Sequence, residues 1–430
     1  MTARVMPRSV AEAALVRQFE EDGTFSSSSR RRDAFARFIA RGLPTRRVET
    51  WHYTDLRSAM SDAAPLSPAP DGWTVESARR LLADRGRVGF ARVVLVNGRL
   101  IRQLSDSLPP GLGIELREPD TVDLDDPMAA LNAAMTLQAC VLSVAEGQQV
   151  PEPIEIVHLA RGQGAFSLYS QLTFFLGRGA SASFLETFLG ASRGAQRNAA
   201  TVLNLAQGAS ATHVAAIEDD PGLHVESQTA RLAANATLDA FAVISGGALT
   251  RRQILHRLQG EGAKVSLAGL TLVNGDRRAD TTLEVAHSAP SGTSREFYRT
   301  IVDDQAMGTF QGKVVVERAA QKTDGAMKSQ AILLSPQAQM NAKPELEIFA
   351  DDVVCGHGAT VGSIDPEQVF YLRSRGVSKS EAESMLLEAF GEEAIGRLRE
   401  QSLASAVRRR FRLWLDSKRD RELAMMEGVS

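Results

Sequence analysis

The chain has 430 residues, of which 43% are hydrophobic and 23% charged, and a formal net charge of −3. This composition is that of an ordinary globular protein, and the weak negative charge excludes bulk attraction to nucleic acid or anionic membranes. Two cysteines, Cys140 and Cys355, cannot form a disulfide framework, which favours a reducing compartment. Because there is neither a signal-like N-terminus nor an apolar stretch of about 18 residues, we expect a cytoplasmic protein with no membrane or nucleic-acid partner.

Residues 1–60 are predicted to form an N-terminal helical region. Apolar residues recur at three- and four-residue steps between residues 8 and 42, and the serine run Ser26–Ser29 interrupts them as a loop. The segment GLPTRRVETWHYTDLRS (42–58) indicates a packed turn that leads into a short helix.

Residues 61–139 are predicted to form a linker and a small α/β region. The stretch 61–72 has three prolines in six residues, which is typical of a linker. The sequence GFARVVLVNGRLI then alternates and turns at Asn97-Gly98, which predicts a β-hairpin.

Residues 140–365 change in texture, because helical periodicity fades and short alternating runs recur. One alanine in each of six runs marks the repeat: Ala180, Ala209, Ala236, Ala263, Ala306 and Ala338. The intervals are 29, 27, 27, 43 and 32 residues. Thin repeating units that cannot bury a core alone are typical of a solenoid, and strand-like units predict a parallel β-helix. The alternative is a β-sandwich whose turns resemble one another by coincidence.

Residues 366–430 are predicted to form a C-terminal helical domain. Ser378 and Glu381 have capping-box spacing, and Gly391 is placed to end the first helix. A second helix is expected from about Glu392. The run RRRFRLW (408–414) places arginines around this helix, and we interpret them as a solvated face.

The stretch KPELEIFADDVVCGHGAT (343–360) contains the most suggestive chemistry. Alternation changes phase at Asp351-Asp352, as at a corner between two strands of one coil. Beyond it Cys355 and His357 share one face, with Cα atoms about 6.5 Å apart. A thiolate and an imidazole at this spacing can bind one soft metal, although two ligands fill only half of a tetrahedral site. Alternatively, Cys355 is a small core residue and His357 a hydrogen-bonded neighbour.

The opposite face of this strand is rich in glycine, with Gly356, Gly358 and Gly362 beside Thr360. Such a stripe lets another backbone approach closely, as at an interface.

Other chemistries find little support. The chain has no P-loop, no G-x-S-x-G elbow and no H-E-x-x-H motif, and its other histidines lack metal-ligand spacing.

Residues 321–390, which include KPELEIFADDVVCGHGATVG and FYLRSRG, closely resemble the C-terminal core of the SufB/SufD family of iron–sulfur cluster assembly proteins. GLPTRRVETWHYTDLR resembles the N-terminal motif of the SufD branch, and GDRRADTTLEVAHSAPSGTSREFYR (275–299) resembles its middle. The resemblance covers most of the chain. It implies a mainly β fold, a right-handed parallel β-helix flanked by N-terminal and C-terminal helical domains.

The resemblance also implies a non-catalytic scaffold subunit that pairs with SufB through the β-helix and binds the SufC ATPase through its C-terminal helices. Cys355 and His357 would be an iron or cluster half-site at the SufB interface, holding a transient cluster rather than a tightly bound cofactor. The contact region for SufC would include Leu386, Phe390, Leu398 and Phe411. A homodimer of the isolated chain is also possible. The alternatives are a SufB-like scaffold, a polysaccharide-acting β-helix enzyme and a self-associating structural solenoid.

Overall fold

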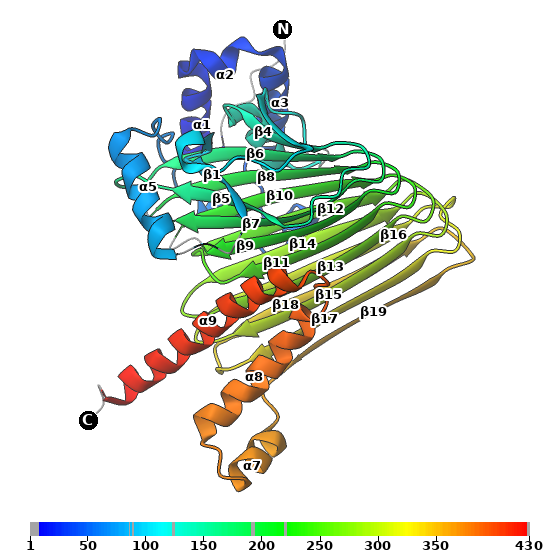
Figure 1. Ribbon diagram of the computed structural model, residues 1–430. Helices are drawn as coiled ribbons and strands as arrows, with labels where there is room; N and C mark the ends of the chain where they lie inside the picture. The colour runs from blue at the N-terminus through cyan, green and yellow to red at the C-terminus, as the bar shows by residue number, and fades with distance from the viewer. Residues whose placement is uncertain are drawn as a thin grey trace.

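The computed structural model describes residues 8–427 except 86, 88–89, 123–124, 191–193 and 219–221, with side chains through residue 421. Its centre is a β-solenoid in which successive strands alternate between two sheets (Figure 1). Every pairing along the two sheets is parallel except the antiparallel pairs at their first edges. The predicted parallel β-helix is therefore confirmed, and the sandwich alternative is wrong.

We call the two sheets odd and even after their strand numbers. The odd sheet contains, in spatial order, β2 (Arg99–Leu100), β1 (Ala91–Val96), β5 (Ile154–Ala160), β7 (Ser181–Gly190), β9 (Ser210–Glu218), β11 (Thr237–Ile244), β13 (Lys264–Val273), β15 (Thr293–Val302), β17 (Asp324–Leu333) and β19 (Val354–Gly362). The even sheet contains β3 (Leu112–Arg117), β4 (Ala139–Val144), β6 (Ser167–Leu176), β8 (Gln196–Leu205), β10 (Leu223–Leu232), β12 (Leu249–Leu258), β14 (Arg278–His287), β16 (Met307–Val316) and β18 (Gln339–Ile348).

The solenoid begins before residue 140, where the sequence pattern placed its start. The predicted hairpin at Asn97-Gly98 is confirmed, but its first strand, β1, also pairs in parallel with β5. The stretch 61–72 is not a free linker, because Leu66 bridges to Ser167 at the start of β6. The earlier start of the solenoid follows from the buried run Val93 to Val96 in β1, since a strand buried on both faces belongs inside a packed sheet.

The marker alanines occupy the corners of the coils. Ala180, Ala209, Ala236 and Ala263 are fully buried and directly precede strands of the odd sheet. The residue before each alanine has a positive φ, between 55° and 68°, which three of the four satisfy with glycine. The next two markers, Ala306 and Ala338, precede strands of the even sheet. The irregular interval of 43 residues therefore marks a change of corner, not a change of coil length.

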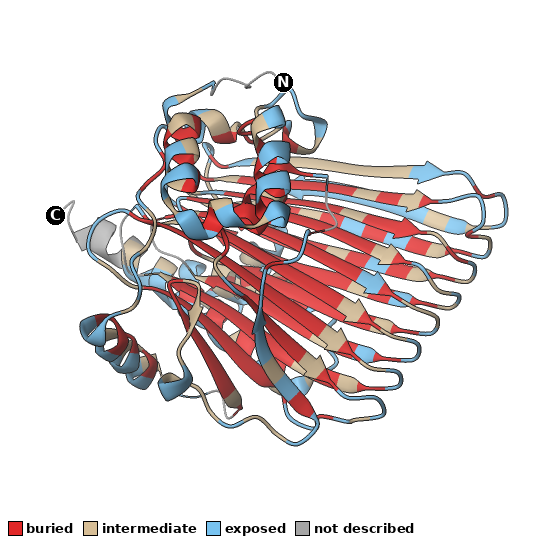
Figure 2. Cartoon of the chain, turned by 90° about the horizontal axis from the view of Figure 1, so that it is seen from above, coloured by how far each residue is buried: buried red, intermediate tan, exposed pale blue. Residues whose placement is uncertain are grey.

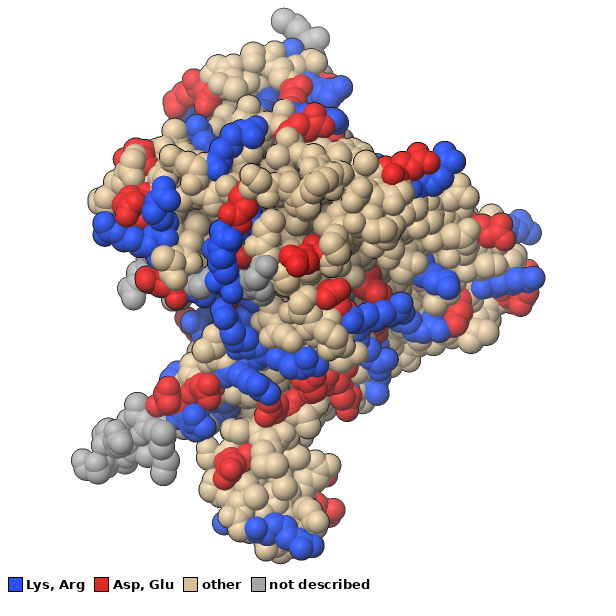
Figure 3. Space-filling view, viewed as in Figure 1, with Lys and Arg blue, Asp and Glu red and all other residues tan. Residues whose placement is uncertain are grey.

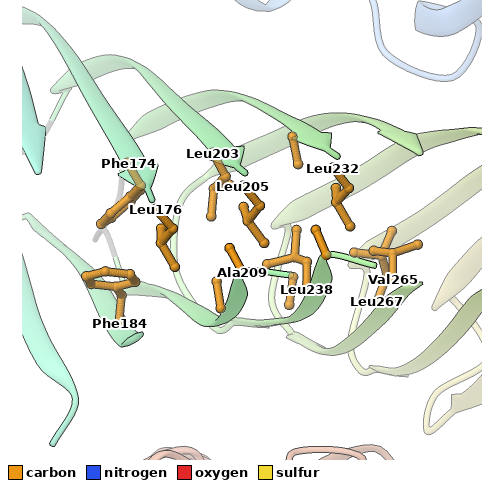
Figure 4. Close-up of a cluster of buried hydrophobic side chains, with 14 of the residues drawn as sticks. Phe174, Leu176, Phe184, Leu203, Leu205, Ala209, Leu232, Leu238, Val265 and Leu267 are labelled. Atoms are coloured by element: carbon orange, nitrogen blue, oxygen red, sulfur yellow. The ribbon is translucent and has the colours of Figure 1, made fainter. Parts of the chain in front are cut away.

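Apolar side chains from the two sheets fill the interior of the solenoid. Figure 4 shows Phe174, Leu203 and Leu232 of the even sheet pointing toward Phe184 and Leu238 of the odd sheet. The middle strands are buried along most of their length (Figure 2). Because each coil covers its neighbours, the fold gains its stability from stacking.

A few charged groups also lie inside the solenoid. His158 Nε2 and His213 Nε2 lie 2.9 Å and 2.8 Å from the two oxygens of buried Glu186. Burial alone would raise the pKa of Glu186, but hydrogen bonds and charge interactions with the two histidines outweigh it and lower the pKa to about 2. These two histidines therefore stabilise a buried carboxylate.

The N-terminal helices cover the outer face of the even sheet. They are α1 (Val10–Glu21), α2 (Gly23–Ser27), α3 (Ser29–Arg41) and, later in the chain, α6 (Pro127–Met135). The segment after α3 contains η1 (Glu49–Trp51) and α4 (Leu56–Ala59) and lies against the same sheet. Its Trp51 donates a 2.6 Å hydrogen bond to Asp126 and stacks under Arg251, which pairs with Asp280 at 2.7 Å. This buried polar anchor confirms the predicted packed turn.

Helix α5 (Gly72–Arg85) packs on the outer face of the odd sheet near its first strands. The short turn η2 (Arg102–Leu104) comes directly after β2. At the other end of the chain follow α7 (Pro366–Ser374), α8 (Lys379–Ile395) and α9 (Gln401–Glu427). Helices α8 and α9 pack across the odd sheet, whereas α7 projects beyond it (Figure 1). Among the described residues, no helix combines the length and apolarity needed to cross a membrane.

Three predictions for the C-terminal helices need correction, although Ser378 does cap α8 as expected. Gly391 does not end α8, which continues to Ile395, and the second helix begins at Gln401. Gly391 instead makes room for the Phe411 ring, since a β-carbon there would lie 2.6 Å from Phe411 Cζ. Arg410 is not solvated, because it is buried and forms a 2.7 Å ion pair with Glu218 of β9.

Candidate functional site

The two ends of the solenoid are different. At the first end the antiparallel strands β2 and β3 cover the interior, with Leu100 and Ile114 packed against it. At the other end β18 and β19 are the last strands of their sheets in the part of the chain that the structure describes. Strand β19 is largely exposed and β18 is mostly half-buried, while Phe349, directly after β18, and Val354, the first residue of β19, are 63% and 74% exposed. Two adjacent free strand edges over an apolar interior can accept strands of another protein.

Cys355 and His357 lie on the inner face of β19, the last strand. In the register with β17, Cys355 is next to Gly325 and His357 is next to the buried Met327. A β-carbon on Gly325 would lie 3.4 Å from the Cys355 sulfur, so this glycine leaves room for the thiol. Cys355 is half-buried against the interior, while His357 is exposed and makes no hydrogen bond to any described residue. The structure thus brings the predicted pair together at the open end.

The outer face of β19 carries the glycine stripe. A β-carbon on Gly356, Gly358 or Gly362 would meet nothing within 4 Å. The strand therefore does not require these glycines for its own packing. They leave the backbone open to close approach from outside.

Cys355 and His357 are both residue types that can bind a soft metal ion. Burial is the main cause that raises the pKa of the Cys355 thiol, and the nearby Asp324 and Glu296 charges act in the same direction. The thiol is therefore protonated near neutral pH and becomes a ligand when a metal displaces its proton. No group of three His, Cys, Asp or Glu residues among those described could hold a metal ion. A metal ion bound by Cys355 and His357 would therefore need further ligands from another molecule.

A neutral acid lies one layer further inside. Glu296 of β15 is adjacent to Met327, which separates it from His357 along the stack. It is fully buried, and neither carboxyl oxygen makes a hydrogen bond of good geometry to a described residue. Burial raises its pKa to about 8, and neighbouring Ser294 and Arg295 offset only part of that effect. Sequence pattern does not single out this residue, because a glutamate in an alternating strand normally faces solvent.

The four residues predicted to contact a partner from the C-terminal helices lie at different depths. Leu398 and Phe411 are buried against the odd sheet, and Leu386 and Phe390 are half-buried. The exposed large apolar side chains of this region are instead Phe370 and Tyr371 of α7, at 74% and 57%, with Met385 of α8 and Leu413 of α9. The adjacent aromatic residues Phe370 and Tyr371 could have indicated an exposed apolar surface from the sequence alone, since neighbouring helical residues cannot both face one core.

The other cysteine, Cys140, lies at the opposite end of the solenoid. It is fully buried in β4, and burial raises the pKa of its thiol to about 12. It is a small apolar residue of the interior.

Comparisons with known proteins agree with this architecture. Residues 158–390 match the family model described as "SUF system FeS cluster assembly, SufBD core domain". The chain is 31% identical to iron–sulfur cluster assembly protein SufD of Escherichia coli, over 90% of this chain and 93% of that protein. It is 26% identical to a SufBD family protein of Synechocystis, over 85% and 86%, and 25% identical to SufD of Bacillus subtilis, over 63% of each. The parallel solenoid ends in a strand with the Cys-x-His pattern, and these proteins match the chain over most of its length. The chain therefore belongs to the SufBD family, and its role is in iron–sulfur cluster assembly by the SUF system.

Proposed function

We propose that the chain is a scaffold subunit that docks through β18 and β19 onto a second solenoid of the SufBD family, with SufB as the partner. The observation that carries the proposal is the open end, where two unpaired strand edges lie beside Cys355 and His357. Exposed strand edges in an isolated chain favour aggregation unless a partner covers them. Docking would pair these edges and cover Phe349 and Val354.

In this complex the nascent iron–sulfur cluster is cargo, and this chain supplies part of its binding site. His357 is exposed and free to turn toward a metal, so it is the principal ligand of the pair. Cys355 is half-buried and serves as a second ligand or as packing beside Gly325. The partner supplies the remaining ligands, because two are too few to hold a cluster.

The C-terminal helices hold the SufC ATPase in this proposal. Leu398 and Phe411 fasten α8 and α9 to the odd sheet, which fixes the position of the projecting α7. Phe370, Tyr371 and Met385 then present apolar surface to the partner. Contiguous exposed apolar residues on a folded helix are typical of an interaction surface.

Reconstitution with SufB and SufC tests the proposal. His357→Ala is expected to lower the cluster yield, measured by iron, sulfide and visible absorbance, and to leave complex assembly and melting temperature unchanged. Cys355→Ala is expected to have a smaller effect on yield. The matched control is Thr360→Ala, on the outer face of the same strand, which should leave the yield unchanged. A wild-type yield with a lowered melting temperature for His357→Ala would make this residue structural.

The same edges also permit pairing of two copies of this chain when SufB is absent. We expect the isolated chain to dimerise through β18 and β19, and addition of SufB to replace the second copy. Size-exclusion chromatography with and without SufB distinguishes these species.

A further inference from the structure

A groove on the outer face of the odd sheet lies beside the loop between α8 and α9, away from the inner face that carries Cys355. Its floor is formed by the first halves of β11, β13, β15 and β17, and Gly396, Arg397 and Arg399 form one wall. Its volume is about 670 Å³. Cavities of this size bind small organic molecules.

The groove is strongly basic. Five cations line it, Lys264, Arg295, Lys328, Arg397 and Arg399, with one outward-facing acid, Asp239. Glu296 borders the groove through its backbone, because its side chain is buried in the interior of the solenoid on the same side of the sheet as Met327. Figure 3 shows Lys and Arg side chains gathered over this side of the solenoid, next to the C-terminal helices. A concave surface with one sign of charge concentrates ligands of the opposite sign.

Two of the five cations are already paired within the chain. Arg295 contacts Asp324 at 2.5 Å, and Arg399 lies 3.7 Å from Asp239. Lys264, Lys328 and Arg397 form no ion pair with any described residue. Three exposed, uncompensated cations around one cavity are more than solubility requires in a chain whose net charge is negative.

The arrangement of the three free cations fits a multivalent anion. Lys264 and Lys328 lie on the sheet, two strands apart, while Arg397 reaches from the loop. The guanidinium of Arg397 stacks on the Phe297 ring at 4.4 Å, which holds it over the groove. Lysine and arginine together suit phosphate groups, the former as a point charge and the latter as a fork of donors.

We propose that this groove binds a phosphorylated small molecule carrying at least two phosphate charges. The cavity is enclosed on the sheet side and by the loop, which favours a small ligand over an extended polymer. Its position between the solenoid and the α8–α9 loop means that the ligand bridges the two parts of the molecule. The inference does not depend on the proposed scaffold function.

The probe is inorganic pyrophosphate, titrated calorimetrically against the full-length chain. The test variant is Lys264→Ala/Lys328→Ala/Arg397→Ala. The matched control is Arg79→Ala/Arg80→Ala/Arg178→Ala, which removes the same charge from exposed sites elsewhere. Because three exposed charge contacts to the ligand are lost together, affinity is expected to fall roughly tenfold or more in the test variant and less than about twofold in the control.

Salt and a second anion complete the test. Binding to the wild-type chain should weaken between about 50 and about 300 mM NaCl, because exposed charges are screened. Lys264→Gln/Lys328→Gln, which removes two of the three charges and keeps a polar side chain at each position, should show an intermediate loss. The proposal is overturned if the wild-type chain does not bind pyrophosphate, or if test and control variants lose affinity equally. Binding of a hexaglutamate peptide in preference to pyrophosphate would overturn the ligand class and assign the groove to an acidic protein segment.

Discussion

Glu296→Gln should make the protein more stable, and increasingly so as the pH rises. The pKa of this carboxyl is raised from 4.5 to about 8 in the folded chain because it is buried without good hydrogen-bond partners. Between these pH values the folded state therefore binds the proton more strongly than the unfolded state. The contribution of the Glu296 carboxyl to the free energy of unfolding is fully present below pH 4.5 and is lost as the pH rises toward 8. Glutamine has the same shape and no proton to lose.

The size of the effect follows from the same two values. Proton linkage gives a penalty for the wild-type chain of about 1 kcal/mol at about pH 5, about 3 kcal/mol at about pH 7 and about 4 kcal/mol at about pH 8. The variant escapes this penalty, so the difference in free energy of unfolding between variant and wild type should grow by about 3 kcal/mol across that range.

Urea unfolding of both proteins, followed by circular dichroism at each pH, measures this difference. Glu261→Gln is the control, because Glu261 is exposed at a corner of the solenoid and its replacement leaves the interior unchanged. A constant difference for Glu296→Gln, or one that grows as the pH falls, would refute the reasoning.

The remaining predictions concern packing, a buried charge and a surface. Gly391→Ala should destabilise the C-terminal helices by about 1–3 kcal/mol through overlap with Phe411, with thermal unfolding as the measurement and Phe411→Leu as the rescuing second change. Glu186→Gln should cost about 3 kcal/mol at pH 7, and this difference should vanish in urea melts as the pH falls from 4.5 toward 2, because the folded-state pKa of Glu186 is lowered to about 2. Phe370→Ser/Tyr371→Ser should abolish co-purification with SufC at an unchanged melting temperature, since both side chains are exposed, and retained binding would place the SufC surface elsewhere.

Much of the solenoid could be predicted because its local chemistry repeats. Ala180 and Ala209 occupy equivalent corners, where only a small residue fits, so the spacing of the coils is visible in the sequence. The phase of alternation likewise placed Cys355 and His357 on one face, as the register with β17 bears out. Both inferences use neighbours along the chain, which is the information that a single sequence contains.

Features that depend on contacts between distant segments could not be predicted. Gly391 has the local chemistry of a helix end, but the Phe411 ring from α9 decides its role. Arg410 belongs to a run that resembles a solvated face, but Glu218 of β9 makes it a buried ion pair. Glu296 is unremarkable in its strand, and burial in the interior is the main cause of its raised pKa.

The central claim is that His357 is a ligand of a cluster held between this chain and its partner. The most direct measurement is pulsed electron paramagnetic resonance of the reduced cluster in the reconstituted complex, with ¹⁵N-labelled histidine in this chain only. We predict a ¹⁵N coupling from a directly bound imidazole, present with the wild-type chain and absent with His357→Ala. A cluster that shows no such coupling with the wild-type chain, or the same coupling with His357→Ala, would contradict the account.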